Sequence, residues 1–172
     1  MFLNGLKAKS IIRKLEKVNS ERIPVTTGNT LSTVCIIETE TNKFDRKKLK
    51  GLASILNVKE EDIQFRSFVK QKKKEDKENP ILFSPKDIGW KGVFKTSSLK
   101  EYRKTNFDLL ISYYTTAHLA ASTVSSLGKA KFKVGIGEDV YRTQDLSLEV
   151  AVGETDLFLT ELEKYLKILK II

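Results

Sequence analysis

The sequence is poor in the side chains that most often build metal and nucleophilic sites. Its 172 residues include one cysteine, Cys35, and one histidine, His118. A single cysteine cannot form an intramolecular disulfide, and common zinc sites need several Cys or His ligands. The same scarcity argues against a Cys–His catalytic pair. We therefore expect no metal, no cofactor and no catalytic residue of these types, with Cys35 as a buried, inert thiol.

Glycine-rich phosphate-binding loops are missing as well. The chain has no GxxxxGK[S/T] segment, which excludes a P-loop, and Gly135-Ile136-Gly137 does not extend to GxGxxG. The turn after the first predicted strand, residues 38–43, is acidic rather than glycine-rich and would repel a pyrophosphate. The common nucleotide-binding fingerprints are thus absent.

Long apolar runs are absent too. No stretch approaches the roughly 20 apolar residues that a membrane span needs. Basic residues from Lys7 onward interrupt the first 18 positions before the apolar core of a secretory signal could form. We expect a cytoplasmic protein.

Positive charge is abundant, with 31 Lys and Arg against 22 Asp and Glu and a formal net charge of +9. Such a surplus favours polyanionic partners, because Lys and Arg displace counterions from phosphates. The alternative is that the charge serves solubility alone. The candidate contacts are Lys7, Lys9, Arg13, Lys14, Lys47, Lys48, Lys72, Lys73 and Lys74.

Residues 1–20 form one predicted unit, an amphipathic basic helix, and residues 21–172 a single α/β domain. Apolar residues recur at helical spacing over positions 2–18, with basic residues between them. Packing on the sheet, attachment to a membrane surface and docking to an acidic partner are the three roles open to this helix. We favour packing, since its apolar face lacks a tryptophan.

The organising stretch is residues 106–137, which reads as strand, helix and strand. Further strands are predicted at 30–38, at 63–69 on an edge or half-exposed, and at 145–152 on an edge. Helices are predicted at about 44–56 and after residue 153, with a helical turn at 99–103. The order predicts a small Rossmann-like or flavodoxin-like three-layer α/β domain, with about five mostly parallel strands and helices on both faces.

Two segments between these elements stand out. Residues 70–80 are almost wholly polar and rich in lysine, which indicates a mobile, solvated loop. Residues 81–95 hold the only tryptophan, Trp90, between Gly89 and Gly92. Trp90 could be an aromatic platform for a base or sugar, or a plug over one end of the core, and we favour the plug.

Ligands of open α/β sheets bind beyond the carboxyl ends of the strands. Here that edge should collect candidate residues from two strands and the turns after them. They are Ser112, Tyr113, Thr115, Thr116, Gly135 and Gly137. The threonines could instead cap a helix and the glycines form a turn. His118 could act as a general base, but we favour an ordinary surface or capping histidine.

Four segments, at 87–92, 107–114, 133–137 and 161–166, resemble an uncharacterised family of small bacterial proteins, a likeness that brings no activity with it. Residues 107–137 also resemble, more distantly, the strand–helix–strand unit in the N-terminal, acceptor-side half of heptosyltransferase-like glycosyltransferases. Ser112 stands where that family often has an acid, so the likeness implies only a fold.

Together these features predict a non-enzymatic basic binding or accessory protein that contacts RNA, a ribonucleoprotein such as the ribosome, or another acidic partner. The alternative is a binder of small anionic ligands, or a degenerate transferase-like enzyme, that uses the edge at 112–116 and 135–139. A contiguous basic face with a filled edge would favour the first, and a pocket at the edge the second.

Overall fold

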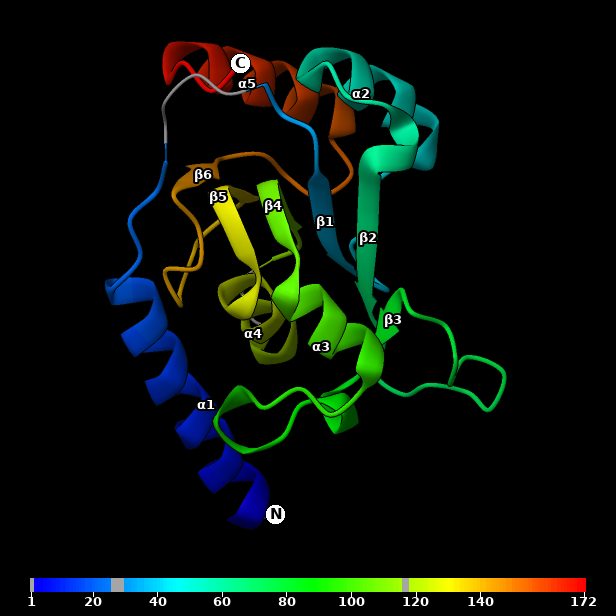
Figure 1. The fold of residues 1–172 in the computed structure, drawn as a ribbon, viewed down its shortest axis with the longest axis vertical. Helices are drawn as coiled ribbons and strands as arrows, with labels where there is room; N and C mark the ends of the chain where they lie inside the picture. Colours follow the sequence, from blue (N-terminus) through cyan, green and yellow to red (C-terminus); the bar gives the residue numbers. More distant parts are fainter. Residues whose placement is uncertain (1, 26–29, 116–117) are drawn as a thin grey trace.

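A computed structural model of the chain describes residues 2–25, 30–115 and 118–172, and it contains one six-stranded sheet (Figure 1). The strands are β1 (Val34–Thr39), β2 (Ile63–Phe68), β3 (Leu82–Phe83), β4 (Asn106–Tyr113), β5 (Lys129–Ile136) and β6 (Leu146–Leu148). Their order is β3-β2-β1-β4-β5-β6, and every neighbouring pair is parallel. This is the strand order of the Rossmann fold.

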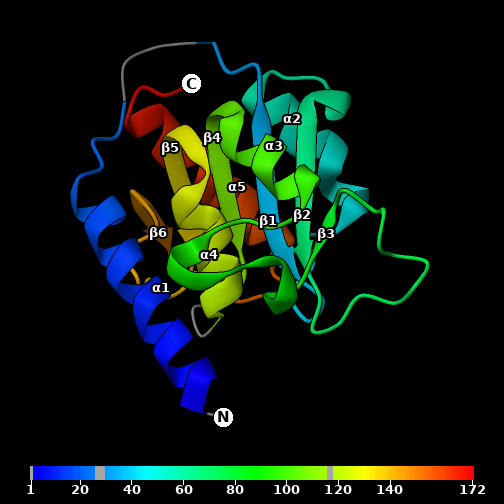
Figure 2. The same cartoon turned by 60° about the horizontal axis from the view of Figure 1, so that its bottom comes forward.

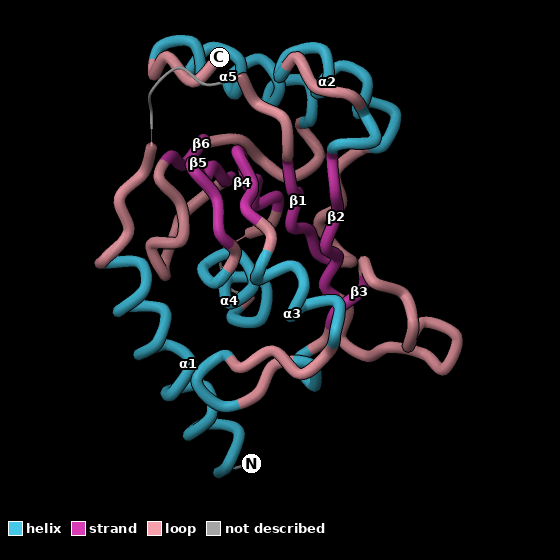
Figure 3. Tube along the Cα trace, viewed as in Figure 1, coloured by secondary structure: helices cyan, strands magenta, loops and turns pink. Residues whose placement is uncertain are grey.

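The described residues form five α-helices, which lie on the two sides of the sheet (Figure 3). They are α1 (Phe2–Ser20), α2 (Leu49–Leu56), α3 (Ser97–Lys104), α4 (Leu119–Leu127) and α5 (Thr155–Ile168). Side chains of α2 and α5 join one buried cluster, and those of α1, α3 and α4 join the other. The predicted three-layer α/β class is confirmed, with six strands in place of about five.

The central strands alternate between the two cores because successive side chains of a strand point to opposite faces. All six positions of β1 are buried. Val34 and Ile36 face the α2–α5 core, while Cys35 and Ile37 face the other core. A strand covered on both faces reads as a continuous apolar run, which is why this one was visible in the sequence.

Aromatic contacts fill the α2–α5 core near the carboxyl end of the sheet. The Phe44 and Tyr113 rings meet edge to face with centroids 5.4 Å apart, and Tyr113 meets Phe158 in the same way at 5.3 Å. Aromatic pairs in this geometry contribute about 0.5–1.5 kcal/mol beyond their buried area. This end of the domain is therefore densely packed on the α2–α5 side.

The amphipathic helix α1 packs chiefly against α4 and the short 3₁₀ turn η4 (Trp90–Gly92), rather than directly on the sheet (Figure 2). Ile11 and Leu15 are the residues it buries most completely. Beyond the helix, the Arg22 guanidinium binds both carboxylate oxygens of Asp145, at 2.9 Å from Nε and 2.6 Å from Nη2. The same carboxylate accepts the Lys133 backbone N–H, so this ion pair ties the end of α1 to β5.

One local prediction needs partial correction. The second strand, β2, is partly exposed, as one of its two predicted alternatives states, but it is not an edge strand, because the two-residue strand β3 pairs with its outer side. The edge position predicted for the last strand is confirmed in β6, which is only three residues long. Among the described residues, no helix is both long and apolar enough to cross a membrane.

Candidate functional surface

The strand order places the switch point of the sheet between β1 and β4. In open α/β folds, ligands bind in the crevice outside the carboxyl ends of the strands at this point. In this chain the crevice would lie between Thr39 on one side and Tyr113 on the other. The contents of this edge therefore test the small-ligand alternative most directly.

On the β1 side the edge is occupied by a buried carboxylate. Glu38 is 1% exposed and pairs with Arg46, with Nη2 2.6 Å from Oε1 and Nη1 2.9 Å from Oε2. It also accepts hydrogen bonds from the Phe44 backbone N–H and the Ser67 hydroxyl. The Arg46 guanidinium lies over the Phe65 ring, 3.5 Å from its centroid. The sequence placed Glu38 at this edge, but nothing in it identified Arg46 as the partner.

On the β4 side the candidate hydroxyls are turned into the protein. Ser112 donates to the Ser125 hydroxyl at 2.9 Å on the α4 face, and Tyr114 shares that hydroxyl at 2.8 Å. Tyr113 points to the opposite face, where its hydroxyl lies 3.1 Å from that of Thr155. All these side chains are buried.

The candidate glycines and threonines are divided in the same way. Gly135 is buried, and the Gln144 side-chain amide covers it so closely that no Cβ would fit. Gly137 has a φ of +71° and open space around it, which suits a turn. Thr115 is exposed, and Thr116 lies outside the described residues. The group that approaches the Gly135 backbone closely is thus the protein's own Gln144 side chain.

A buried lysine lies beside these hydroxyls. Lys133 is 1% exposed, and its Nζ donates to the Ser125 and Ser126 carbonyl oxygens, at 2.7 and 3.0 Å. These carbonyls lie in the last turn of α4, so the Lys133 amino group caps that helix. Burial, with the nearby Arg22 charge, lowers the pKa of Lys133 to about 7. Lys133 was not among the residues predicted from the sequence.

One pocket, of about 290 Å³, lies between the first half of α1 and the start of α4. It is lined largely by apolar side chains, with Lys7 and His118 among its polar members. The His118 ring packs edge to face on Phe68 with centroids 4.5 Å apart, and burial lowers the pKa of His118. His118 precedes α4 but forms no capping hydrogen bond with its side chain.

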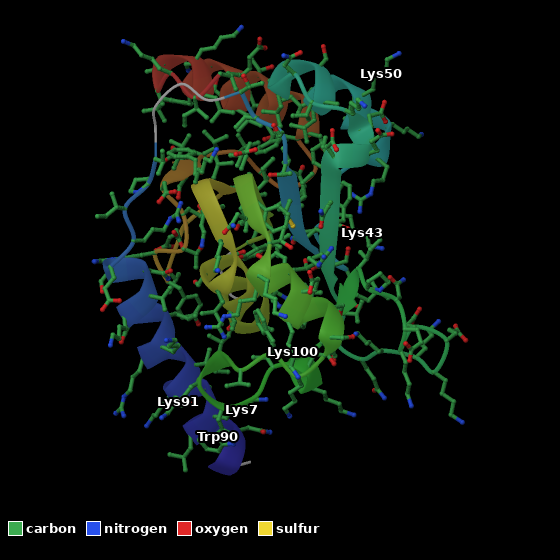
Figure 4. All side chains as sticks on the ribbon, viewed as in Figure 1. Lys7, Lys43, Lys50, Trp90, Lys91 and Lys100 are labelled. Carbon is green, nitrogen blue, oxygen red and sulfur yellow. The ribbon has the colours of Figure 1, made fainter. Side chains whose placement is uncertain are left out.

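Positive charge gathers where α1 meets the turn at η4. The cluster, which we call the α1–η4 surface, comprises Lys7, Arg13, Lys14, Lys91 and Lys95. One shallow hollow there is lined by Ser10, Arg13, Lys14 and Lys91. The pKa of Lys7 is lowered, first by burial and then by the nearby charge of Lys95. Lys7, Trp90 and Lys91 lie together beside α1, away from Lys43 and Lys50 (Figure 4). Within the described part of the chain, none of these five cations has an ion-pair partner.

Two other predicted contact lysines lie on a different layer. Lys47 and Lys48 belong to the 3₁₀ turn η1 (Arg46–Lys48), which leads into α2 on the opposite layer. Lys48 pairs with Asp156 at 2.7 Å, and Lys72 pairs with Asp87 at 3.2 Å. The nine predicted cations therefore do not form a single surface, and two of them are already neutralised.

Trp90 is 50% exposed, so the prediction that it plugs one end of the core is wrong. The neighbouring Ile88 and Phe94, each 2% exposed, close the core at that point. They pair as an antiparallel bridge across the turn that carries Trp90. The indole is thereby left at the surface of the turn.

Comparison with known proteins adds a family and no activity. Residues 7–169 match the sequence profile of a family of unknown function, DUF6913. No curated protein and no solved structure matches the chain. Among the described residues, no group of three or more His, Cys, Asp or Glu side chains is placed to hold a metal ion.

Proposed function

The chain belongs to DUF6913, a family of unknown function, and we propose from its geometry that it is a non-enzymatic binding or accessory protein for RNA, a ribonucleoprotein such as the ribosome, or another acidic partner. The observation that carries the proposal is the α1–η4 surface, where five cations gather without an ion-pair partner among the described residues. A cytoplasmic location belongs to the same proposal.

Neighbouring cations repel one another, and the pKa of Lys7 is lowered by burial and, to a smaller extent, by the charge of Lys95. A bound polyanion would relieve the repulsion and release its own counterions. Association driven in this way weakens steeply as salt is added. Salt dependence is therefore the first property to measure.

The state of the sheet edge supports the same proposal. A reaction site needs an acid, base or nucleophile that a substrate can reach. Here the Glu38 carboxylate is bonded to Arg46, and the hydroxyls of Ser112 and Tyr113 are buried and bonded internally. Each group is already satisfied by the protein, which favours a structural role for it.

The alternative function is a binder of small anionic ligands or a degenerate transferase-like enzyme. The pocket of about 290 Å³ beside Lys7 and His118 favours it, because it lies next to the start of α4. A thermal-shift screen with nucleotides and sugar phosphates tests it. Stabilisation by one of these compounds that Lys7→Ala abolishes would support this alternative.

The main proposal is tested by purifying the chain from its native host at low salt, with and without nuclease treatment. RNA or ribosomal protein that leaves the sample as salt rises would support it. Purified chain is then titrated with ribosomal RNA over a range of salt concentrations. Absence of binding even at low salt would show the proposal to be wrong.

Matched double variants locate the contact. Lys14→Ala with Lys91→Ala removes two charges from the α1–η4 surface, and Lys47→Ala with Lys50→Ala removes two from the opposite layer. Both pairs change the net charge equally. We expect the first pair to weaken binding to RNA several-fold more than the second. Equal weakening would refute the assignment to this surface.

A further inference from the structure

Trp90 lies at the tip of a tight turn with a fixed base. The Gly89 N–H donates to the Val93 carbonyl at 2.7 Å, and the Val93 N–H donates to the Trp90 carbonyl at 3.1 Å. Below them, the buried pair Ile88 and Phe94 anchors both arms of the turn. A half-exposed indole is thus held on a rigid support.

Two helices hold this turn from its sides. The Lys91 backbone N–H donates to the Ser10 hydroxyl of α1 at 3.1 Å. Gly92, with a φ of +73°, packs so closely on α4 that an added Cβ would lie 2.9 Å from Leu127 Cδ1. Because the turn is fixed before any ligand arrives, little ordering is needed on binding.

The cations beside Trp90 form a short row along α1. Lys7 and Lys14 are seven residues apart, so they lie on the same side of the helix about 10 Å from each other. Ser10 lies between them in the helix, and its bond to the Lys91 backbone N–H brings the main chain of a third lysine beside this row. A row of this length can contact more than one phosphate of an extended strand.

Lys91 itself has an unusual backbone. Its φ of +53° lies in the left-handed region, which residues other than glycine seldom adopt. Such conformations persist where the surroundings impose them, and they are frequent at binding sites. Glycine would suit the turn better, yet the sequence has a cation there.

We propose that this surface binds a single-stranded segment of RNA, with an unpaired base stacked on Trp90 and phosphates held by Lys7, Lys14 and Lys91. The inference rests on the proposed function and makes its partner specific. Base stacking on an exposed aromatic ring, beside a cationic track for the backbone, is the general mode of single-strand recognition. Bases of a duplex are already stacked on one another, so duplex RNA meets only the cations.

The test uses the full chain and a ten-nucleotide single-stranded RNA, with duplex RNA of the same length for comparison. Trp90 is the only tryptophan, so its fluorescence reports stacking directly. We expect the single strand to quench it and to bind more tightly than the duplex. Three phosphate contacts predict a slope of about −2 in log affinity against log salt.

Variants separate stacking from charge. Trp90→Ala should weaken single-strand binding about 5- to 100-fold, while Trp90→Phe keeps most of it. Neither should change binding to heparin, which offers charge without bases. Lys91→Gly relieves the left-handed backbone, so the weaker binding and shallower salt slope expected of it cannot come from unfolding.

The two proposals fail in different ways. Equal affinity for single strand and duplex, or unchanged single-strand binding in Trp90→Ala, overturns the stacking inference while a polyanion-binding function stands. If the native chain binds none of these RNAs, heparin or ribosomes at low salt, the proposed function itself is wrong.

Discussion

Replacing Lys133 by methionine should remove a pH dependence from the stability of the fold. The folded-state pKa of Lys133 is about 7, against an ordinary value of 10.5. Between these values the unfolded chain holds a proton that the folded chain has released. The contribution of Lys133 to the free energy of unfolding therefore rises with pH between 7 and 10.5. It is complete above pH 10.5, and it is lost as the pH falls through the folded-state pKa of about 7.

From pH 7 to pH 9 the expected gain is about 2 kcal/mol, since each pH unit is worth about 1.36 kcal/mol and the group is half-titrated at pH 7. For a chain of this size that equals roughly 4–8 °C in melting temperature. Urea unfolding followed by circular dichroism at pH 7, 8 and 9 measures the change. Lys133→Met should lack this rise.

Lys129→Met is the control, since Lys129 is exposed on the same strand. It should keep the pH profile of the native chain. If the native protein and Lys133→Met changed in parallel between pH 7 and pH 9, the assignment of a neutral, buried amine at this position would be refuted.

Three further predictions concern the packing around the two cores. Gly128→Ala should destabilise the fold by about 1–3 kcal/mol in urea unfolding, because its methyl group would collide with the buried Tyr102 hydroxyl; unchanged stability would contradict this packing. Arg22→Ala should cost about 3–5 kcal/mol in the same assay by leaving the Asp145 carboxylate without its partner, and a loss below 1 kcal/mol would argue against a buried pair. Burial raises the pKa of Cys35 to about 12, so its thiol should react with a thiol reagent only when the protein unfolds. Stoichiometric labelling of the native protein within minutes would disprove its burial.

The parts of the fold that could be predicted are those with strong local patterns. The apolar run of β1 and the leucine stripe of α5 carry their own periodicity. The two-residue strand β3 has no period to detect. Its pairing, which makes β2 internal, depends on contacts made across the Lys-rich loop.

The candidate site was harder to predict because its character depends on what covers each residue. Lys131 and Lys133 have the same parity on β5, and a period-two pattern treats them alike. In the fold Lys131 is exposed and pairs with Asp108, while Lys133 is buried beneath α4. Trp90 is the opposite case: an aromatic side chain between glycines was predicted to lie in the core, and it lies at the surface.

The docking of α1 also has a consequence for the order in which the chain can assemble. Helix α1 is synthesised before its partners, because the η4 turn and α4 lie about 70 to 125 residues later in the sequence, and Asp145, which holds Arg22, is later still. Until that part of the chain has emerged and folded, Ile11 and Leu15 have nowhere native to be buried. Helix α1 is therefore made before every segment that buries its apolar side.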